Sequence, residues 1–328
     1  MPAAITRLAP SPTGALHLGN ARTFLLTWAI ARRNAWKVLL RIEDLDGPRV
    51  KPDSIASCID TLAWLGIDWD QGPLIQSHDL APYVNAMRRL AALGLAYPST
   101  HSRTEIEDAA ATLALSAPQE DAHDTPFPAS LRPHLCPRPF DPAPGDASHA
   151  PPQSNWRFVT PDTPTTVVDA FAGTHSFDTA RIVGDFVVWT KRDQPAYQLA
   201  VVVDDHRHGI THVVRGDDLL DSAARQLLLY RALNLSPEPN HLHLPLVKGP
   251  DGKRLAKRHG DTRVGFYRDQ GVPADRVIGL LAFWSGLSPV RRPMSAPEFR
   301  DRLDLTMIPK GPVTFTQEDH QWLLQSAQ

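Results

Sequence analysis

This sequence has few cysteines, no long apolar run and little net charge. Only Cys58 and Cys136 occur among 328 residues, which argues against a disulfide scaffold. No apolar run approaches the roughly 20 residues that a membrane-spanning helix needs, and the first residues lack the charged and apolar regions of a secretory signal. We therefore expect a cytoplasmic protein that has no membrane partner.

The charge balance and composition narrow the class further. A formal net charge of -2 argues against a protein that coats nucleic acid nonspecifically, although a local basic face could still hold one RNA. The 42% hydrophobic and 21% charged residues are typical of soluble globular proteins. The length fits one large α/β domain with an appendage, or two domains.

The most informative segment is residues 7–20, which leads from an apolar, strand-like stretch into an amphipathic helix predicted near 20–34. Two prolines and a glycine exclude regular secondary structure between the strand-like stretch and the helix. His17 and Gly19 stand where that helix begins and exposes unpaired backbone N–H groups, and such an end attracts phosphate. His17 and Asn20 lie three residues apart, so both could reach a bound phosphate.

Strands and helices alternate after this turn. Residues 37–42 are predicted as a buried strand that ends just before Glu43, and residues 54–65 as a helix. This order implies a parallel sheet, where ligands collect at the carboxyl ends of the strands. We expect Ser11 and Glu43 to face one pocket there.

The rest of the chain gives a less regular pattern. Ten prolines between 118 and 152 exclude a helix or central strand and favour an exposed, partly disordered insertion. Residues 197–203 and 212–215 are predicted as strands, and 222–233 as a helix. From 265 onward, helical stretches interrupted by prolines indicate a small helical appendage.

A second candidate phosphate site lies in residues 251–260. Four cations stand there between glycines: Lys253, Arg254, Lys257 and Arg258. A solvated charged loop is the usual interpretation of such a run. Together with the first motif, however, it indicates a mobile loop that closes over the triphosphate of ATP.

These motifs resemble those of class I aminoacyl-tRNA synthetases of the glutamyl group. His17-Leu-Gly-Asn20 is similar to the first signature, and Arg254-Leu-Ala-Lys-Arg258 to the second. Similar blocks follow in the family order at residues 41–46, 197–205 and 209–221. The resemblance implies an α/β, Rossmann-like catalytic domain with an acceptor-binding insertion and a short helical C-terminal appendage.

The resemblance also implies site residues. Those matching positions that hold glutamate are Arg7, Ala9, Ser11, Glu43, Tyr197 and Arg215; those matching ATP-binding positions are His17, Gly19, Asn20, Arg254 and Lys257. Cationic donors, one anionic acceptor and a hydroxyl suit an amino acid with two carboxylates and an ammonium group. Adenylate formation from ATP with Mg²⁺ requires charge stabilisation, so we expect His17 and Lys257 to act electrostatically.

The chain departs from the family at two places. Arg254 and Ala256 stand where the second signature usually has lysine and serine. The positions matching a family zinc site are Ser99, His101, Arg132 and Cys136. Because serine and arginine are poor zinc ligands, we expect no tightly bound zinc.

The expected division is 1–96 and 191–262 for the two halves of the catalytic domain, 97–190 for the insertion, with its disordered stretch near 118–154, and 263–328 for the appendage. The resemblance at this length implies an ATP-dependent ligase that activates L-glutamate without tRNA and transfers it to the queuosine base of tRNA(Asp), as a monomer. Two alternatives are a truncated glutamyl-tRNA synthetase that charges a tRNA 3′ end, and a noncatalytic module that binds glutamate or nucleotide.

Overall fold

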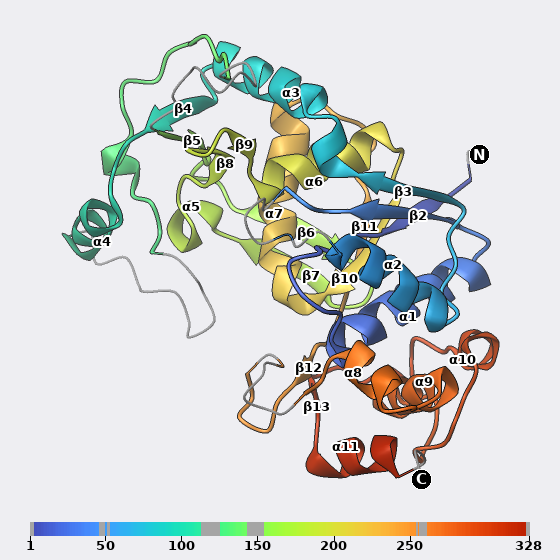
Figure 1. Cartoon of the computed structure of the whole chain (residues 1–328). Coiled ribbons are helices and arrows are strands. Elements are labelled where there is room, and N and C mark those ends of the chain that lie inside the picture. Colours follow the sequence, from blue (N-terminus) through green and yellow to red (C-terminus); the bar gives the residue numbers. More distant parts are fainter. Residues whose placement is uncertain are drawn as a thin grey trace.

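A parallel sheet built from the N-terminal third of the chain positions the first motif. The computed structural model describes residues 3–45, 50, 53–112, 125–142, 154–253, 255 and 261–325. The sheet has the order β1-β2-β3, with β1 (Ile5–Leu8), β2 (Lys37–Ile42) and β3 (Gln71–Ile75) all parallel. Helices α1 (Leu18–Arg33) and α2 (Ser54–Trp64) connect them, which confirms the predicted parallel α/β arrangement (Figure 1).

A second sheet continues the first. Its order is β10-β11-β6-β7, with strands β6 (Thr165–Asp169), β7 (Gly173–Phe177), β10 (His212–Gly216) and β11 (Asn240–Leu244). The pairs β10–β11 and β11–β6 are parallel, and α7 (Leu220–Ala232) connects β10 to β11. The backbone N–H of Thr211 donates to the Ile5 carbonyl at 2.9 Å, so β1 and β10 lie side by side. The carboxyl ends of β1, β2, β10 and β11 therefore meet at one edge.

An antiparallel sheet forms the insertion. It has the order β4-β5-β8-β9, with β4 (Ala96–Ser99), β5 (Asn155–Phe158), β8 (Val187–Thr190) and β9 (Gln194–Pro195). The helices of this part are α3 (Ala81–Ala92), α4 (Arg103–Thr112) and α5 (Thr179–Ile182). In Figure 1 this part lies at the upper left, away from the C-terminal helices.

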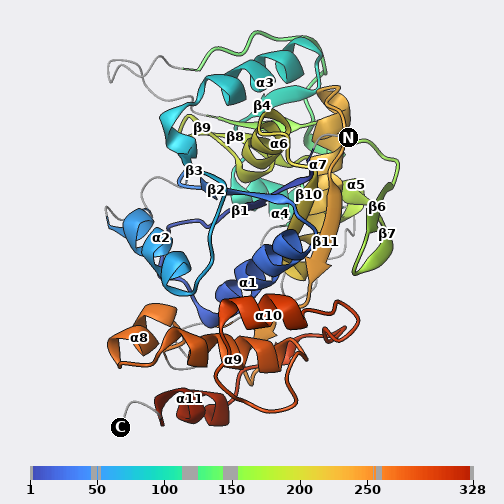
Figure 2. The same ribbon diagram turned by 90° about the vertical axis from the view of Figure 1, so that its right-hand side faces the viewer.

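The C-terminal helices pack beneath α1. They are α8 (Val264–Asp269), α9 (Ala274–Trp284), α10 (Ala296–Arg302) and α11 (Gln317–Leu324), and the short pair β12 (Val247–Lys248) and β13 (Val313–Thr314) joins them to the preceding part. Figures 1 and 2 both show α9 and α10 below α1. One hydrophobic core includes residues of α1, α2 and all four C-terminal helices. Among the residues that the structure describes, no helix is long and apolar enough to cross a membrane.

The prediction of a strand at 197–203 is wrong: α6 (Tyr197–Arg207) is a helix. Its residues from Gln198 to Asp205 are all buried. A helix that is enclosed on every side has no polar face, so its sequence lacks the 3.6-residue periodicity. Three consecutive valines then resemble a buried strand.

Within the insertion that was predicted to be exposed near 118–154, residues 125–142 are only partly exposed, and some of them pack into the core. Phe127 and Phe140 are buried there, and Phe140 packs edge-on against Trp156 and Trp189. The Phe127 N–H donates to the Val183 carbonyl at 2.9 Å. Prolines exclude regular hydrogen-bonded elements but not packing through aromatic side chains between them. The rest of the predicted disordered stretch lies outside the described residues.

Candidate active site

The first signature is joined to the segment that follows the basic loop. His17 immediately precedes α1 and forms an antiparallel bridge with Arg263. The His17 Nδ1 atom lies 2.8 Å from the Thr262 hydroxyl, and the Leu18 N–H donates to the Thr262 carbonyl at 2.9 Å. Burial lowers the pKa of His17, although Asp261 opposes the shift. A neutral imidazole therefore sits at the amino end of a 16-residue helix.

The basic loop itself is only partly described. Arg254 and Lys257 lie outside the described residues, but Leu255 and Lys253 lie within them. A Cβ built on Gly19 would be 3.8 Å from the Leu255 side chain, so the loop approaches α1 at this turn. Asn20, one residue further on, is exposed. The structure thus brings both flanks of the basic loop to the first signature.

Four predicted glutamate-site residues converge from four segments. Arg7 lies on β1, Glu43 follows β2, Tyr197 begins α6 and Arg215 lies on β10. Their charges are mutually coupled: Arg215, Glu43 and Arg7 all influence the Tyr197 hydroxyl, whose pKa is raised by burial. The Tyr197 side chain is 41% exposed, but that area faces a concave cavity.

The turn residues lie beside this group. The Glu43 N–H donates to the Pro10 carbonyl at 3.0 Å, which places the segment between Ala9 and Ser11 against the end of β2. Ala9 is half-buried and Ser11 is exposed. The turn and Glu43 thus lie side by side, and the expectation that Ser11 and Glu43 face one pocket stays a prediction.

A buried ionic network supports the group, and its central residue was not predicted. Arg41 Nη1 lies 2.7 Å from Asp205 Oδ1, and Arg41 Nη2 lies 3.0 Å from Glu43 Oε1. Arg7 Nε donates to the same Asp205 oxygen at 3.2 Å. Burial raises the pKa of Glu43 despite Arg41, whereas Arg7 and Arg41 together lower the pKa of Asp205. An arginine inside an apolar strand was the available signal, because a buried cation needs carboxylate partners.

Two further residues that sequence reasoning missed lie behind Arg215. His243 Nε2 accepts a hydrogen bond from Arg215 Nε at 2.9 Å, and His243 Nδ1 lies 2.6 Å from Asp169 Oδ2. Arg215 and His243 are register partners on β10 and β11, so their side chains leave the sheet together. Histidines at alternate positions of a strand, as at 241 and 243, were the available signal.

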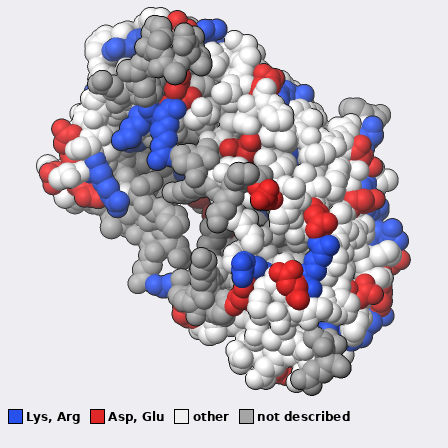
Figure 3. Space-filling view, viewed as in Figure 1, with Lys and Arg blue, Asp and Glu red and all other residues white. Residues whose placement is uncertain are grey.

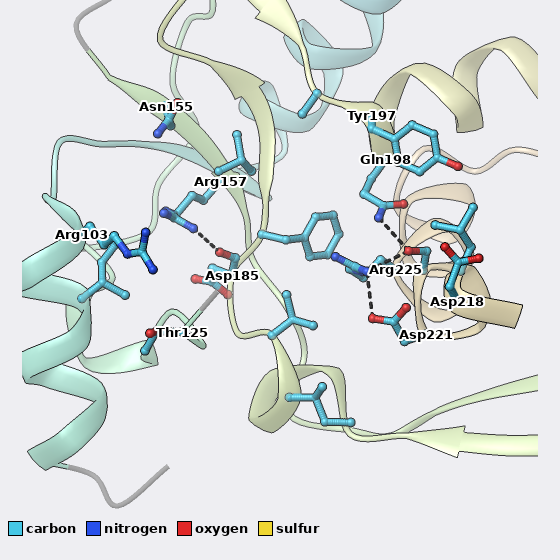
Figure 4. A pocket seen from close by; sticks show the side chains of 18 of the residues that line it. Arg103, Thr125, Asn155, Arg157, Asp185, Tyr197, Gln198, Asp218, Asp221 and Arg225 are labelled. Atoms are coloured by element: carbon cyan, nitrogen blue, oxygen red, sulfur yellow. Dashed lines mark hydrogen bonds and ion pairs between the residues drawn. The ribbon is translucent and has the colours of Figure 1, made fainter. Parts of the chain in front are cut away.

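A cavity of about 1170 Å³ extends from Tyr197 toward the insertion. Figure 4 shows Arg225 in its wall, hydrogen-bonded to Asp221 at 2.9 Å, with Gln198 nearby. On the opposite wall, Arg157 Nη1 donates to the Asp185 carbonyl at 2.7 Å. Cations that line the cavity are Arg103, Arg157, Lys191, Arg225, Lys248 and Lys253. Figure 3 shows Lys and Arg side chains on the visible face of the insertion, over β4, β5 and α4.

The four residues at the family's zinc positions do not fit a zinc ion. The Arg132 guanidinium donates to both carboxylate oxygens of Asp185, at 2.6 and 2.7 Å, so it occupies this region as an ion-pair partner. Ser99 Oγ lies 3.2 Å from His101 Nδ1, whereas the Cys136 backbone packs beside Gly94 after α3. Within the described ranges, no group of three His, Cys, Asp or Glu side chains could hold a metal.

Comparisons with known proteins agree on one family. Residues 3–322 match the family of class I tRNA synthetases (E and Q), catalytic domain. The chain is 44% identical to the glutamyl-Q tRNA(Asp) synthetase of Rhodopirellula baltica over 88% of this chain and 87% of the relative, and 42% identical to that of Symbiobacterium thermophilum over 95% and 96%. It is 41% identical to the glutamate–tRNA ligase of Desulfosudis oleivorans over 84% of this chain and 56% of that protein.

A solved structure of a glutamate tRNA ligase is also similar to this chain. The crystal structure of a glutamate tRNA ligase from Elizabethkingia meningosepticum, in complex with its amino acid, superimposes with a TM-score of 0.76 at 27% identity. The match covers 98% of this chain and 68% of that one.

Proposed function

Because the chain belongs to the catalytic-domain family of class I glutamyl- and glutaminyl-tRNA synthetases, we propose that it activates L-glutamate with ATP and transfers it to the queuosine base of tRNA(Asp). The glutamate α-carboxylate attacks the α-phosphorus of ATP, and pyrophosphate leaves. A hydroxyl of the acceptor then attacks the activated carbonyl, and AMP leaves. The protein is an ATP-dependent ligase whose first step needs no tRNA.

The observation that carries this proposal is the convergence of Arg7, Glu43, Tyr197 and Arg215. Two guanidinium groups attract the carboxylates of glutamate, and the Glu43 carboxylate attracts its ammonium group. The Tyr197 hydroxyl supplies a further hydrogen bond at the mouth of the site. Ala9 and Ser11 complete the site through the turn that lies against Glu43.

The ATP half of the site lies at the amino end of α1. His17, Gly19 and Asn20 would face the phosphates there, and Arg254 and Lys257 would reach them from the basic loop. Negative charge grows on the phosphates during adenylation, and a positioned cation stabilises it without transferring a proton. Lys257, as that cation, and His17, as a neutral imidazole that can donate a hydrogen bond, are the proposed catalytic residues, and Mg²⁺ accompanies ATP as part of the substrate.

Queuosine is favoured as the acceptor over a tRNA 3′ end, because two relatives named glutamyl-Q tRNA(Asp) synthetase are 44% and 42% identical to the chain over most of both lengths. Three relatives named glutamyl-Q tRNA(Asp) synthetase are 37 to 44% identical to the chain, and their matches cover 87 to 96% of their own lengths. A relative named glutamate–tRNA ligase is 41% identical to the chain, so 3′-end charging is the second candidate. Cytoplasmic location, a monomeric state and the absence of bound zinc complete the proposal.

Glutamate-dependent ATP–pyrophosphate exchange, measured with and without tRNA, tests the first step. Exchange without tRNA is expected; exchange that requires tRNA would favour the glutamyl-tRNA synthetase alternative. No exchange under either condition would favour the noncatalytic module.

The acceptor is tested separately with an anticodon stem-loop of tRNA(Asp), which has no 3′ CCA end. Glutamate should be attached to the stem-loop that carries queuosine and not to the same stem-loop with guanosine. Attachment only to the 3′ end of full-length tRNA would contradict the queuosine proposal.

A further inference from the structure

Arg215 is held along one edge of its guanidinium. Its Nε donates to His243 Nε2 at 2.9 Å, and its Nη2 donates to the Leu219 carbonyl at 3.2 Å. The third nitrogen, Nη1, is buried and has no hydrogen-bond partner among the described residues. The side chain is therefore held at two nitrogens, the Tyr197 hydroxyl also interacts with its guanidinium, and Nη1 is left for a ligand.

The hydrogen bond from Arg215 determines which ring nitrogen of His243 carries the proton. An arginine Nε always bears hydrogen, so His243 Nε2 must accept and His243 Nδ1 must carry the proton. Nδ1 lies 2.6 Å from Asp169 Oδ2, which accepts that proton's hydrogen bond. Both ring nitrogens of His243 thus form hydrogen bonds, one with Asp169 and the other with Arg215, and this arrangement links the three side chains. Protonation of the second nitrogen would place two N–H groups against each other.

The electrostatics keep this arrangement in one state. Burial and the neighbouring Arg215 cation lower the pKa of His243, against the opposing effect of Asp169, so the ring stays neutral. Hydrogen bonds from His243 and from backbone N–H groups lower the pKa of Asp169, so it stays charged.

Asp169 is itself rigidly placed. One of its carboxylate oxygens accepts the backbone N–H groups of Phe171 and Ala172, at 2.9 and 2.7 Å. The other accepts the backbone N–H of His243 at 3.0 Å. These bonds fix the carboxylate at the end of β6, so the sheet and the tight turn after β6 together set the position of His243.

We infer that Asp169 and His243 are positioning residues, which orient Arg215 so that its unpartnered Nη1 meets a carboxylate of glutamate. This inference rests on the proposed function for the identity of the ligand. Without His243, the buried Nε of Arg215 would lose its acceptor, and the guanidinium would turn to find another. Misplacing one binding group in this way costs affinity even though the group itself remains.

Calorimetric titration of L-glutamate into the intact protein tests this, with His243→Met as the main variant. Methionine has a similar volume and removes both hydrogen bonds, so the glutamate Kd should rise about 10- to 100-fold. The affinity for ATP should not change. His243→Gln can still present an oxygen to Arg215 Nε and an N–H to Asp169, so part of the lost affinity should return.

His241→Met is the matched control. His241 lies two residues away on the same strand, is also buried, and stacks on His243 with 5.9 Å between ring centroids. Its loss changes packing beside the arrangement but not the bond to Arg215, so its glutamate Kd should stay within about 2-fold of the wild-type value.

Asp169→Asn gives a second test if His243→Met fails to fold, because asparagine keeps the side-chain size while allowing the wrong histidine tautomer. It should also weaken glutamate binding, and the double variant should bind no more weakly than His243→Met alone. Wild-type affinity in folded His243→Met or Asp169→Asn would overturn the positioning inference. A wild-type protein that binds no glutamate would instead overturn the proposed function.

Discussion

Lys257 is the residue on which the proposed adenylation depends most. Replacing it with alanine removes the cation proposed to stabilise the phosphates, so ATP–pyrophosphate exchange should fall about 100- to 1,000-fold. The thermal unfolding midpoint should not change, because the loss is one of charge stabilisation in the transition state. Lys37→Ala is the control, since Lys37 is an exposed lysine at the start of β2. Near-normal exchange by Lys257→Ala would refute the catalytic role.

His241 makes stability depend on pH. Burial, reinforced by the nearby Arg215, lowers the pKa of His241 from 6.5 to about 3. Between these values the unfolded chain binds a proton that the folded protein does not, so the free energy of unfolding falls as pH falls below 6.5. One such group contributes a slope of about 1.4 kcal/mol per pH unit.

His241→Met should remove this contribution and flatten the dependence. Urea unfolding at about pH 7, 6 and 5 gives the slope for each protein, and His78→Gln, at an exposed histidine, should leave it unchanged. Equal slopes for wild type and His241→Met would show that His241 is not held neutral by the fold.

Several residue-scale features could be predicted from the sequence, and others could not. Arg7, Glu43, Tyr197 and Arg215 stand in recognisable motifs, and the structure brings them together. Their roles stay predictions. Asp169 has no motif around it; it reaches His243 only because β6 pairs with β11, a contact between segments about 70 residues apart. Such long-range pairing is not encoded in any local pattern.

At the scale of elements, the Arg132–Asp185 pair joins the segment at 125–142 to the rest of the insertion. Asp185 is fully buried and also accepts hydrogen bonds from the Tyr97 hydroxyl at 2.6 Å and the Thr160 N–H at 2.8 Å. Gly184 permits the Phe127 backbone to approach closely, because a Cβ at position 184 would lie 1.9 Å from the Phe127 carbonyl oxygen.

Removing the Arg132 guanidinium should therefore destabilise the insertion. Arg132→Met removes the ion-pair partner of the buried Asp185 carboxylate, and the free energy of unfolding should fall by about 1–3 kcal/mol. Adding Asp185→Asn should recover part of that loss, since no uncompensated charge remains. Denaturant unfolding measures both, and an unchanged midpoint for Arg132→Met would contradict the structural role of the pair.

The insertion should also be insensitive to metal chelation. Its zinc positions hold a serine, a histidine, an arginine and a cysteine, and the arginine is already paired with Asp185. We expect dialysis against a chelator to leave the thermal unfolding midpoint unchanged, and the exchange activity unchanged once the chelator is removed and Mg²⁺ is supplied with ATP. Metal analysis that finds one zinc per chain after dialysis would show this expectation to be wrong.

Element types were predictable where one face of an element meets solvent and the other meets the core. Helix α2 falls where its amphipathic pattern places it, whereas β2, which is buried on both faces, was recognised from its short apolar run. Helix α6 was misassigned because it is buried all around, and its amphipathic pattern is absent. The packing of Phe127 and Phe140 was missed because proline content predicts local backbone conformation. It does not predict whether the aromatic side chains between the prolines are buried.

At the scale of the whole molecule, the appendage shares its core with the catalytic part. Phe299 of α10 and Trp284 of α9 belong to the same buried cluster as Leu25 of α1. Arg22 of α1 also donates to the Ser285 hydroxyl at 3.1 Å. The hydrophobic core is continuous across the predicted boundary at 262/263. The boundary therefore stays a prediction from the sequence.

Deleting residues 263–328 should accordingly abolish cooperative folding of the remainder. The deletion would expose the apolar face of α1 to water, at about 25 cal/mol per Å² of newly exposed apolar surface. Circular dichroism and thermal unfolding of the shortened chain provide the measurement. A soluble fragment with a sharp unfolding transition would show that the appendage is a separate domain.

The Arg132–Asp185 pair also bears on how the protein matures. A domain closed by a metal must wait for an ion delivered from outside the chain, and it opens when that ion is withdrawn or its thiolates are oxidised. A guanidinium–carboxylate pair is complete once the ribosome has released both residues, and neither partner is oxidised. This contact can therefore form during zinc starvation or oxidative stress, when proteins that must be loaded with metal remain unfinished.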